Sequence, residues 1–252
     1  MKRYFSLVLY KAITELKAES SRAFLGILWW IVEPLLYMAA FYTVFAMGMR
    51  GGGREFVPFL LCGLVPWKWF NSTVQVGANT IVNNRGLIEQ VYLPKLLLLI
   101  SVLVSNFIRF LIILALLFAL LAAMGYLPGM AWLWLPYVIV VQIAVMLGIA
   151  CWAAAIIPFL PDFRLIIDNG LLILFFMSGI FYDVADRPAE AQVLFNWNPL
   201  LHLVNAYRDV LMHNRIPDLE VLTIVFVLSL VVFAAGAWAI HRLDRVFPKV
   251  IE

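Results

Sequence analysis

The chain has 252 residues, of which 65% are hydrophobic and only 13% charged, and its formal net charge is +3. Its mean hydropathy of +0.97 is typical of a polytopic membrane protein and argues against an ordinary soluble domain. The small net charge, spread between apolar runs, argues against nucleic acid as a partner. Cys62 and Cys151 lie far apart inside apolar runs, so neither a disulfide framework nor a metal-binding spacing is expected.

The N-terminal stretch is amphipathic. Over residues 2–22, apolar side chains recur at helical spacing and charged side chains occupy the remaining face. We expect residues 1–22 to form an interfacial helix that lies on the membrane; the alternative is an ordinary solvated helix. No cleavable signal is expected, because the first residues are charged and amphipathic.

Six apolar runs follow, and each meets or approaches the roughly 20 residues that a helix needs to cross the hydrocarbon. They cover residues 25–48, 57–82, 96–123, 132–157, 165–182 and 219–240. The fifth and shortest run leads into residues 183–218, which Pro188, Pro199 and Pro217 interrupt. We expect short re-entrant helices there, because irregular backbone at membrane depth must be covered by protein or water. The predicted fold class is an all-α membrane protein with one transmembrane domain over residues 1–252.

The basic residues indicate the orientation of these spans. Most of the 18 Lys and Arg residues fall on the side of the N-terminus, so the positive-inside rule places both termini in the cytoplasm. Residues 83–95 then form a cytoplasmic segment, and residues 183–218 face outward as a periplasmic gate segment.

Among the charged residues inside the predicted spans, three stand out: Glu33, Lys68 and Arg109. Such charges cost roughly 2.5–3.5 kcal/mol each on insertion scales and are usually paired or functional. We expect these three to be able to pair with one another. Polar stripes accompany them, namely Lys68, Asn71, Ser72, Gln75 and Asn79 in the second span and Ser101, Ser105 and Arg109 in the third. The stripes either hydrogen-bond between helices or line a wetted path for a polar solute.

Aromatic side chains are dense in the first and fifth spans. They include Trp29, Trp30, Tyr37 and Phe41 in the first, and Phe175, Phe176, Phe181 and Tyr182 in the fifth. Near span ends such residues are commonly interface anchors. Their faces also stack on sugar rings, which would suit a channel for a glycan.

Catalytic motifs are largely missing. No HExxH or other metal spacing occurs, and Gly51, Gly52 and Gly53 are not followed by the Lys and Ser or Thr of a phosphate-binding loop. If transport needs ATP, another chain must hydrolyse it. A membrane-embedded transferase or hydrolase is the alternative from another class, and its acid, base and metal groups would come from Asp168, Asp183, Asp186, His202 and Asp209.

Several motifs together resemble the permease subunits of type 2 ABC exporters that move bacterial surface polysaccharides. They are RAFLGILWWIVEPLL (22–36), GLVPWKWF (63–70), NNRGLIEQVYLPK (83–95), PDFR (161–164), SGIFY (178–182) and WNPLLHLVNAYRDVL (197–211). The resemblance covers nearly the whole chain. One departure is Lys68, where the family is expected to have an uncharged polar residue.

The resemblance implies that residues 83–95 are a coupling helix that docks into an ABC ATPase subunit. The chemistry agrees, because Leu87, Ile88, Val91 and Tyr92 supply an apolar face, Arg85 and Glu89 supply a charged rim, and Pro94 ends the helix. It further implies a permease dimer whose first and fifth spans line a channel, with ATP and Mg²⁺ bound by the partner subunit and no cofactor in this chain.

The function expected is export of a lipid-linked polysaccharide, such as O-antigen or capsule, across the bacterial inner membrane. Teichoic acid is the equivalent cargo in a Gram-positive cell. The alternative within transport is a small-molecule or lipid efflux permease of the same superfamily.

Overall fold

A computed structural model describes residues 2–22, 26–29, 32, 35–37, 39–40, 43, 55–91, 93–184 and 187–250. Over these residues the protein is helical and contains no strand. Most of the first predicted span lies outside the described residues, as do Trp30, Glu33, Phe41, Tyr92 and Asp186.

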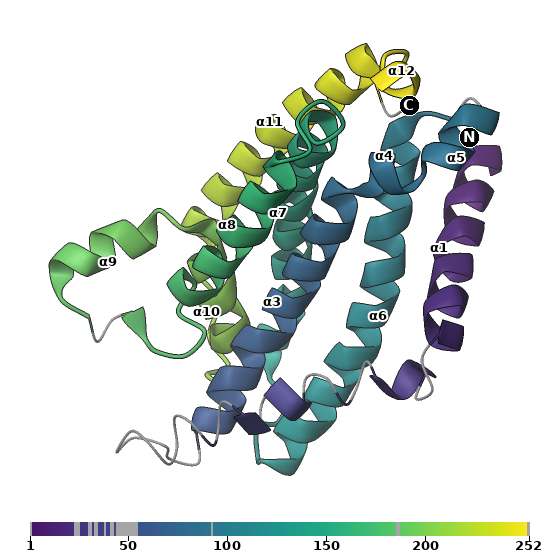
Figure 1. The fold of residues 1–252 in the computed structure, drawn as a ribbon. Helices are drawn as coiled ribbons and strands as arrows, with labels where there is room; N and C mark the ends of the chain where they lie inside the picture. The colour runs from purple at the N-terminus through teal and green to yellow at the C-terminus, as the bar shows by residue number, and fades with distance from the viewer. Residues whose placement is uncertain are drawn as a thin grey trace.

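Three helical stretches of the described chain are long and apolar enough to cross a membrane: Lys95–Ala123, Met130–Ile156 and Leu219–Leu243. The first is α6 and the last is α11, while the middle stretch joins the 3-10 turn η2 (Met130–Trp134) to α7 (Leu135–Ile156). They coincide with the third, fourth and sixth predicted spans. In Figure 1 these helices and α3 (Phe56–Ala78) run along one another as a bundle.

The helices at the second and fifth predicted spans are not among those long and apolar enough to cross a membrane. Helix α3 has 23 residues, but its polar stripe makes it less apolar than the three helices above. Helix α8 (Phe163–Met177) has 15 residues, fewer than the roughly 20 needed. It ends before Gly179, whose φ of +64° suits glycine. A crossing by α3 or α8 therefore stays a prediction.

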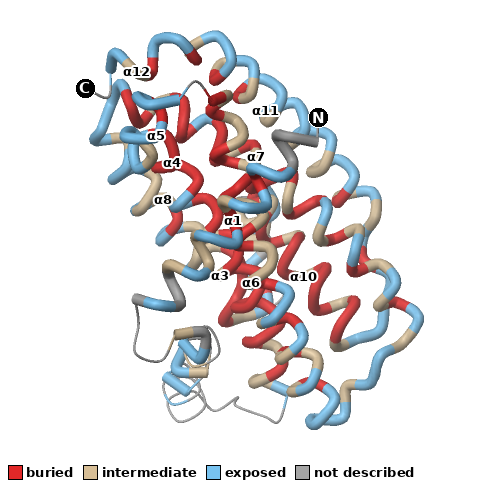
Figure 2. The backbone as a smooth tube through the Cα atoms, turned by 90° about the vertical axis from the view of Figure 1, so that its right-hand side faces the viewer, coloured by how far each residue is buried: buried red, intermediate tan, exposed pale blue. Residues whose placement is uncertain are grey.

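The core runs through the middle of the bundle. Figure 2 shows buried residues concentrated along α3, α7 and α10 (Pro199–Leu211). Helices α7 and α11 approach closely where Gly236 meets α7, since a Cβ on Gly236 would lie 2.8 Å from the Cβ of Cys151. In a bilayer no hydrophobic effect drives helices together, so small residues that allow close van der Waals packing favour such crossings.

The N-terminal helix α1 (Lys2–Arg22) has the predicted bounds and packs on another helix. It runs alongside α6 in Figure 1, and it buries Val8 and Ala12. Ser105 on α6 donates a hydrogen bond to Glu15 at 3.4 Å. Part of the apolar face of α1 is thus covered by α6, and the location of α1 at the membrane interface stays a prediction.

Proline sets the bounds of the short helices between α8 and α11, as the sequence predicted. Pro188 directly precedes α9 (Ala189–Asn196), Pro199 is the first residue of α10, and Pro217 comes just before the Asp218 cap of α11. Helix α9 stands apart from the bundle in Figure 1.

The remaining short helices are η1 (Gly26–Leu28), α4 (Thr80–Asn83), α5 (Arg85–Gln90) and α12 (Phe247–Val250). Figure 1 shows α4, α5, α12 and the start of α1 gathered at one end of the bundle.

Candidate transport path and docking segment

A cavity of about 320 Å³ lies where α3 faces α8 and the first predicted span. Its lining includes Tyr37, Trp67, Lys68, Asn71, Asp168 and Phe175. Four of these, Tyr37, Lys68, Asn71 and Phe175, are predicted channel residues that come from three separate parts of the sequence. We call this space the polar cavity.

Charged and amide groups in and beside the polar cavity contact one another. The Lys68 ammonium lies 4.4 Å from the centre of the Tyr37 ring, a cation–π contact. Gln75, also a predicted channel residue, donates from Nε2 to Asp168 Oδ1 at 3.0 Å, and Arg164 Nε lies 3.9 Å from Asp168 Oδ2. Aromatic faces beside hydrogen-bonding side chains can contact a sugar ring on its apolar face and at its hydroxyl groups.

The fifth-span aromatics form one cluster, but they do not all face the polar cavity. Phe175 packs on Trp67 with ring centres 5.4 Å apart and edge-to-face on Phe181 at 5.0 Å. Phe181 is buried and therefore supports the wall, whereas Phe176 is exposed. The Tyr182 hydroxyl donates to the Phe176 carbonyl at 2.6 Å, so this side chain turns back on its own segment.

The polar stripe of α3 lies on two faces of the helix, and only one of them borders the polar cavity. Lys68, Asn71 and Gln75 face the polar cavity or Asp168. Ser72 instead donates to Asn106 Oδ1 of α6 at 3.1 Å, and the Asn79 amide donates to the Gln75 carbonyl at 2.9 Å. The Ser72 bond therefore links α3 to α6, whereas the Asn79 bond stays within the last turn of α3.

Two other predictions are only partly covered. Arg109 is half-buried on α6, and its predicted pairing with Glu33 lies outside the described residues. Of the first-span aromatics, Tyr37 lines the polar cavity, while Trp29 is exposed and outside its lining; Trp30 and Phe41 are not described.

Arg208 holds the turn that follows α8. Its guanidinium donates to the carbonyls of Gly179 and Ile180, both at 2.9 Å, and to the Phe59 carbonyl of α3 at 3.3 Å. It also lies over the Phe59 ring at 3.4 Å. The side chain is 3% exposed, and this burial lowers the pKa of Arg208 to about 10, so it stays charged at neutral pH.

Asn198 contacts the end of α8, next to the turn that Arg208 holds. Its side-chain oxygen accepts from the backbone of Leu200 at 3.0 Å and so caps α10. Its amide donates to the Met177 carbonyl at 3.2 Å and to Ser178 Oγ at 3.1 Å, which ties α10 to the end of α8. The sequence analysis assigned no role to Asn198 or Arg208, although both lie in the motif WNPLLHLVNAYRDVL. The available signals were an Asn directly before Pro199 and an Arg that helical spacing places on the same face as Leu201 and Val204.

Within the docking segment, residues 83–95, the described residues form the short helix α5 between the end of α4 and the start of α6. Helix α5 ends at Gln90, because Val91 is already extended at φ −139° and ψ 131°. The prediction that Pro94 ends this helix is therefore wrong. Pro94 instead occupies the N-cap position of α6. Arg85 and Glu89 pair at 2.7 Å on the exposed side.

The apolar residues of the docking segment divide between two surfaces. Leu87 is 38% exposed and Val91 55% exposed, whereas Ile88 is 5% exposed. Ile88 is buried in a cluster with Phe247 and Leu98 of the same chain. The prediction that Ile88 faces a partner is therefore wrong here, because α12 already covers it.

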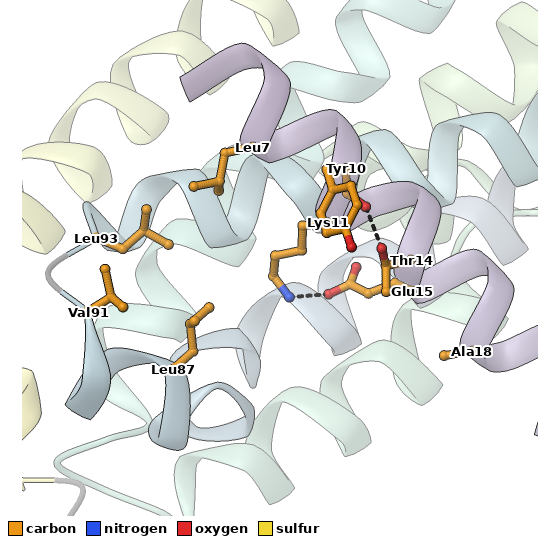
Figure 3. A pocket seen from close by; sticks show the side chains of 9 residues that line it. All are labelled: Leu7, Tyr10, Lys11, Thr14, Glu15, Ala18, Leu87, Val91 and Leu93. Carbon is orange, nitrogen blue, oxygen red and sulfur yellow. Dashed lines mark hydrogen bonds and ion pairs between the residues drawn. The ribbon is translucent and has the colours of Figure 1, made fainter. Parts of the chain in front are cut away.

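A groove of about 430 Å³ separates α1 from the docking segment. Figure 3 shows Leu87, Val91 and Leu93 facing Leu7 and Tyr10 of α1 across it. Lys11 and Glu15 pair on α1 at this groove. Lys11 also donates to the Asn84 side chain at 2.9 Å, so α1 braces the docking segment.

Three of the groups proposed for an enzyme, Asp168, His202 and Asp209, have separate partners. Asp183 lies near enough to Asp209 to help raise its pKa, and Asp186 lies outside the described residues. Asp168 contacts Gln75, Asp209 lies 3.6 Å from His213, and His202 Nε2 contacts the Asn196 carbonyl at 2.8 Å. Burial raises the pKa of Asp209, and His213 opposes this rise. Among the described residues, no three His, Cys, Asp or Glu side chains gather as a metal site would require.

The long apolar helices and the motifs around them define the class of protein, a helical integral membrane protein. The chain belongs to the ABC-2 type transporter family, which it matches over residues 11–212.

Named relatives cover almost the entire chain. An O-antigen export system permease protein RfbA from Myxococcus xanthus is 30% identical over 93% of this chain and 91% of its own length. A Klebsiella pneumoniae protein of the same name is 24% identical over 98% and 95%. The polysialic acid transport protein KpsM of Escherichia coli is 24% identical over 91% and 90%.

Proposed function

We propose that this chain is the transmembrane subunit of an ATP-driven exporter that moves a lipid-linked polysaccharide across the bacterial inner membrane to the periplasm. The observation that carries this proposal is the near full-length similarity to permeases named for O-antigen export and polysialic acid transport. ATP and Mg²⁺ would be bound by a separate ABC ATPase subunit.

The polar cavity is the proposed place on the transport path. Tyr37, Trp67 and Phe175 supply flat apolar faces, while Lys68 and Asn71 supply hydrogen-bond donors. A second copy of the chain would complete the channel, and α8 with the first span would line it. Weak stacking contacts suit a moving polymer, since strong fixed hydrogen bonds would stall it.

The docking segment is the proposed contact with the ATPase. Leu87 and Val91 expose apolar side chains beside the Arg85–Glu89 pair, and Tyr92 is included from the sequence alone. Ile88 would support this surface from beneath. We further propose six spans with both termini in the cytoplasm, which puts the docking segment on the side where ATP is available.

The test is copurification from native membranes at low detergent, with the accompanying proteins identified by intact mass. We expect an ABC ATPase at equal stoichiometry, and we expect its loss when Leu87 and Val91 are both changed to Asp. The matched control is Leu127→Asp, because Leu127 is also exposed but lies in the loop after α6.

Two outcomes would overturn the proposal. A lone chain that turns over a lipid-linked sugar without any ATPase would establish the enzyme alternative. The efflux permease would be established by a chain that has an ATPase partner and whose deletion leaves surface polysaccharide normal but abolishes efflux of a small amphiphile.

A further inference from the structure

Lys95 and Asp244 form a buried ion pair between two helix ends that are 149 residues apart in the sequence. Lys95 Nζ lies 3.3 Å from Asp244 Oδ1, and the two residues are 3% and 7% exposed. Lys95 is the last residue of the docking segment and the first residue of α6, and Asp244 is the C-cap of α11.

Each of the two charges is unfavourably placed with respect to its own helix. A cation at a helix N-terminus and an anion at a C-terminus both oppose the helix dipole. Across the two helices the arrangement becomes favourable, because the carboxylate of Asp244 reaches the N-terminus of α6. There its Oδ1 also accepts the backbone N–H of Lys95 at 3.4 Å, whereas Pro94 makes no side-chain cap. The pair therefore has a physical rationale as a link between helices.

Apolar packing surrounds this link and includes the docking segment. Ile88 of α5 and Phe247 of α12 belong to the same buried cluster as Leu98 of α6 and Ile240 of α11. Helices α5 and α12 are in contact, and both lie at the same end of the bundle in Figure 1. The docking segment, the start of α6 and the end of α11 consequently form one packed unit.

Beyond this unit, α11 is joined to the rest of the bundle mainly along α7. Gly236 meets Cys151 there, and Trp152 Nε1 of α7 donates to the Val232 carbonyl at 3.1 Å. A displacement of the docking segment can thus reach α7 through α11 when the end of α11 moves with the start of α6. Chains of packed side chains and hydrogen-bonded groups of this kind can carry coupling between distant sites.

We propose that Lys95 and Asp244 are a positioning pair that transmits movement of the docking segment to α11 during transport. This role rests on the proposed function, since it assumes an ATPase that pushes on the docking segment. The pair touches neither ATP nor the glycan; it acts by keeping two helix ends together.

The test compares Lys95→Met, Asp244→Asn and the double swap of Lys95→Asp with Asp244→Lys, each in complex with the ATPase. Three quantities are measured: chain in the membrane, ATPase retained, and polysaccharide exported per ATP hydrolysed. We expect the single variants to insert and retain the ATPase but to export about tenfold less per ATP, within the range of coupling between sites. We expect the swap to recover most of the loss.

Arg242→Met is the matched control, because Arg242 lies near the same end of α11 but is exposed, and we expect it to export normally. Lys95→Arg, which keeps the charge, provides a second variant should Lys95→Met fail to accumulate; we expect it to retain most of the export per ATP.

Several results would overturn the inference. They are a normal export ratio in the single variants, a fall in membrane amount at constant export per ATP, or a swap no better than the single changes. Failure of the proposed function would look different, because the unaltered protein would then lack an ATPase or leave the polysaccharide inside.

Discussion

At the scale of single residues, Arg208 joins three segments of the bundle. Its guanidinium contacts carbonyls of the turn after α8 and of α3, while the residue itself belongs to α10. A guanidinium suits this place, because its planar fork offers several donors in fixed directions and remains charged when buried. Gly63 leaves room for it, since a Cβ there would lie 3.1 Å from Arg208 Nη2.

We expect Arg208→Ala to destabilise the protein strongly. It leaves the buried carbonyls of Gly179 and Ile180 without their donor, and each unsatisfied group costs about 1–3 kcal/mol. Arg208→Lys should restore little, because a single ammonium cannot reproduce the fork. Thermal unfolding in detergent checks both, with exposed Arg215→Ala as the control. Equal melting temperatures for Arg208→Ala and the control would contradict this role.

At the scale of elements, the contact between α7 and α11 depends on the absence of a side chain at Gly236. A Cβ there would meet Cys151 Cβ at 2.8 Å and Trp152 Cδ1 at 3.2 Å. Gly170 on α8 is the opposite case, since nothing lies within 4 Å of a Cβ added there.

We therefore predict opposite effects for the same substitution at these two glycines. Gly236→Ala should lower the melting temperature by forcing α11 away from α7, with a cost of about 1–3 kcal/mol typical of overpacking. Gly170→Ala should be neutral or stabilising by up to about 1 kcal/mol, because alanine favours a helix. Equal shifts in melting temperature for the two variants would show that α7 and α11 pack less closely at Gly236 than the structure indicates.

The placement of α1 along α6 is a second feature at this scale, and a crosslink can test it. Glu15 and Ser105 lie side by side, so the pair Glu15→Cys and Ser105→Cys should form a disulfide on mild oxidation in native membranes. Lys17→Cys with Ser105→Cys is the control, because Lys17 is exposed on α1. Crosslinking of the control alone, or of neither pair, would favour a helix lying flat on the membrane.

At the scale of the whole molecule, the topology stays a prediction, and it sets a condition on where the helix ends lie. The start of α1, the docking segment and α12 lie at one end of the bundle (Figure 1), as a cytoplasmic location for all three requires. The loop from α10 to α11, which contains Ile216, should then lie on the outer side.

Labelling with a membrane-impermeant maleimide tests this topology. In spheroplasts we expect Ile216→Cys to react at once and Arg245→Cys to react only after permeabilisation, since both positions are exposed. The native Cys62 and Cys151 are fully buried and should stay unlabelled, so the unaltered chain is the control. Reaction of Arg245→Cys in sealed spheroplasts would show that the chain has the opposite orientation in the membrane.

The sequence by itself determined the helical class, the three long apolar helices and the proline-bounded short helices. These properties are local: length and hydropathy decide whether a helix can sit in a bilayer, and proline limits where a helix can begin. It also brought Tyr37, Lys68, Asn71 and Phe175 together as candidates, because polar and aromatic residues in apolar runs are unusual whatever their neighbours are.

Only the tertiary structure decided which faces of these helices meet. Asp168 lines the polar cavity because α8 packs on α3. Ile88 is buried because α12 covers it. Lys95 meets Asp244 because the start of α6 lies beside the end of α11. Periodicity predicts that a helix has an apolar face, but not which helix will cover it. That choice depends on the fit of side chains far apart in the chain, as at Gly236 and Cys151.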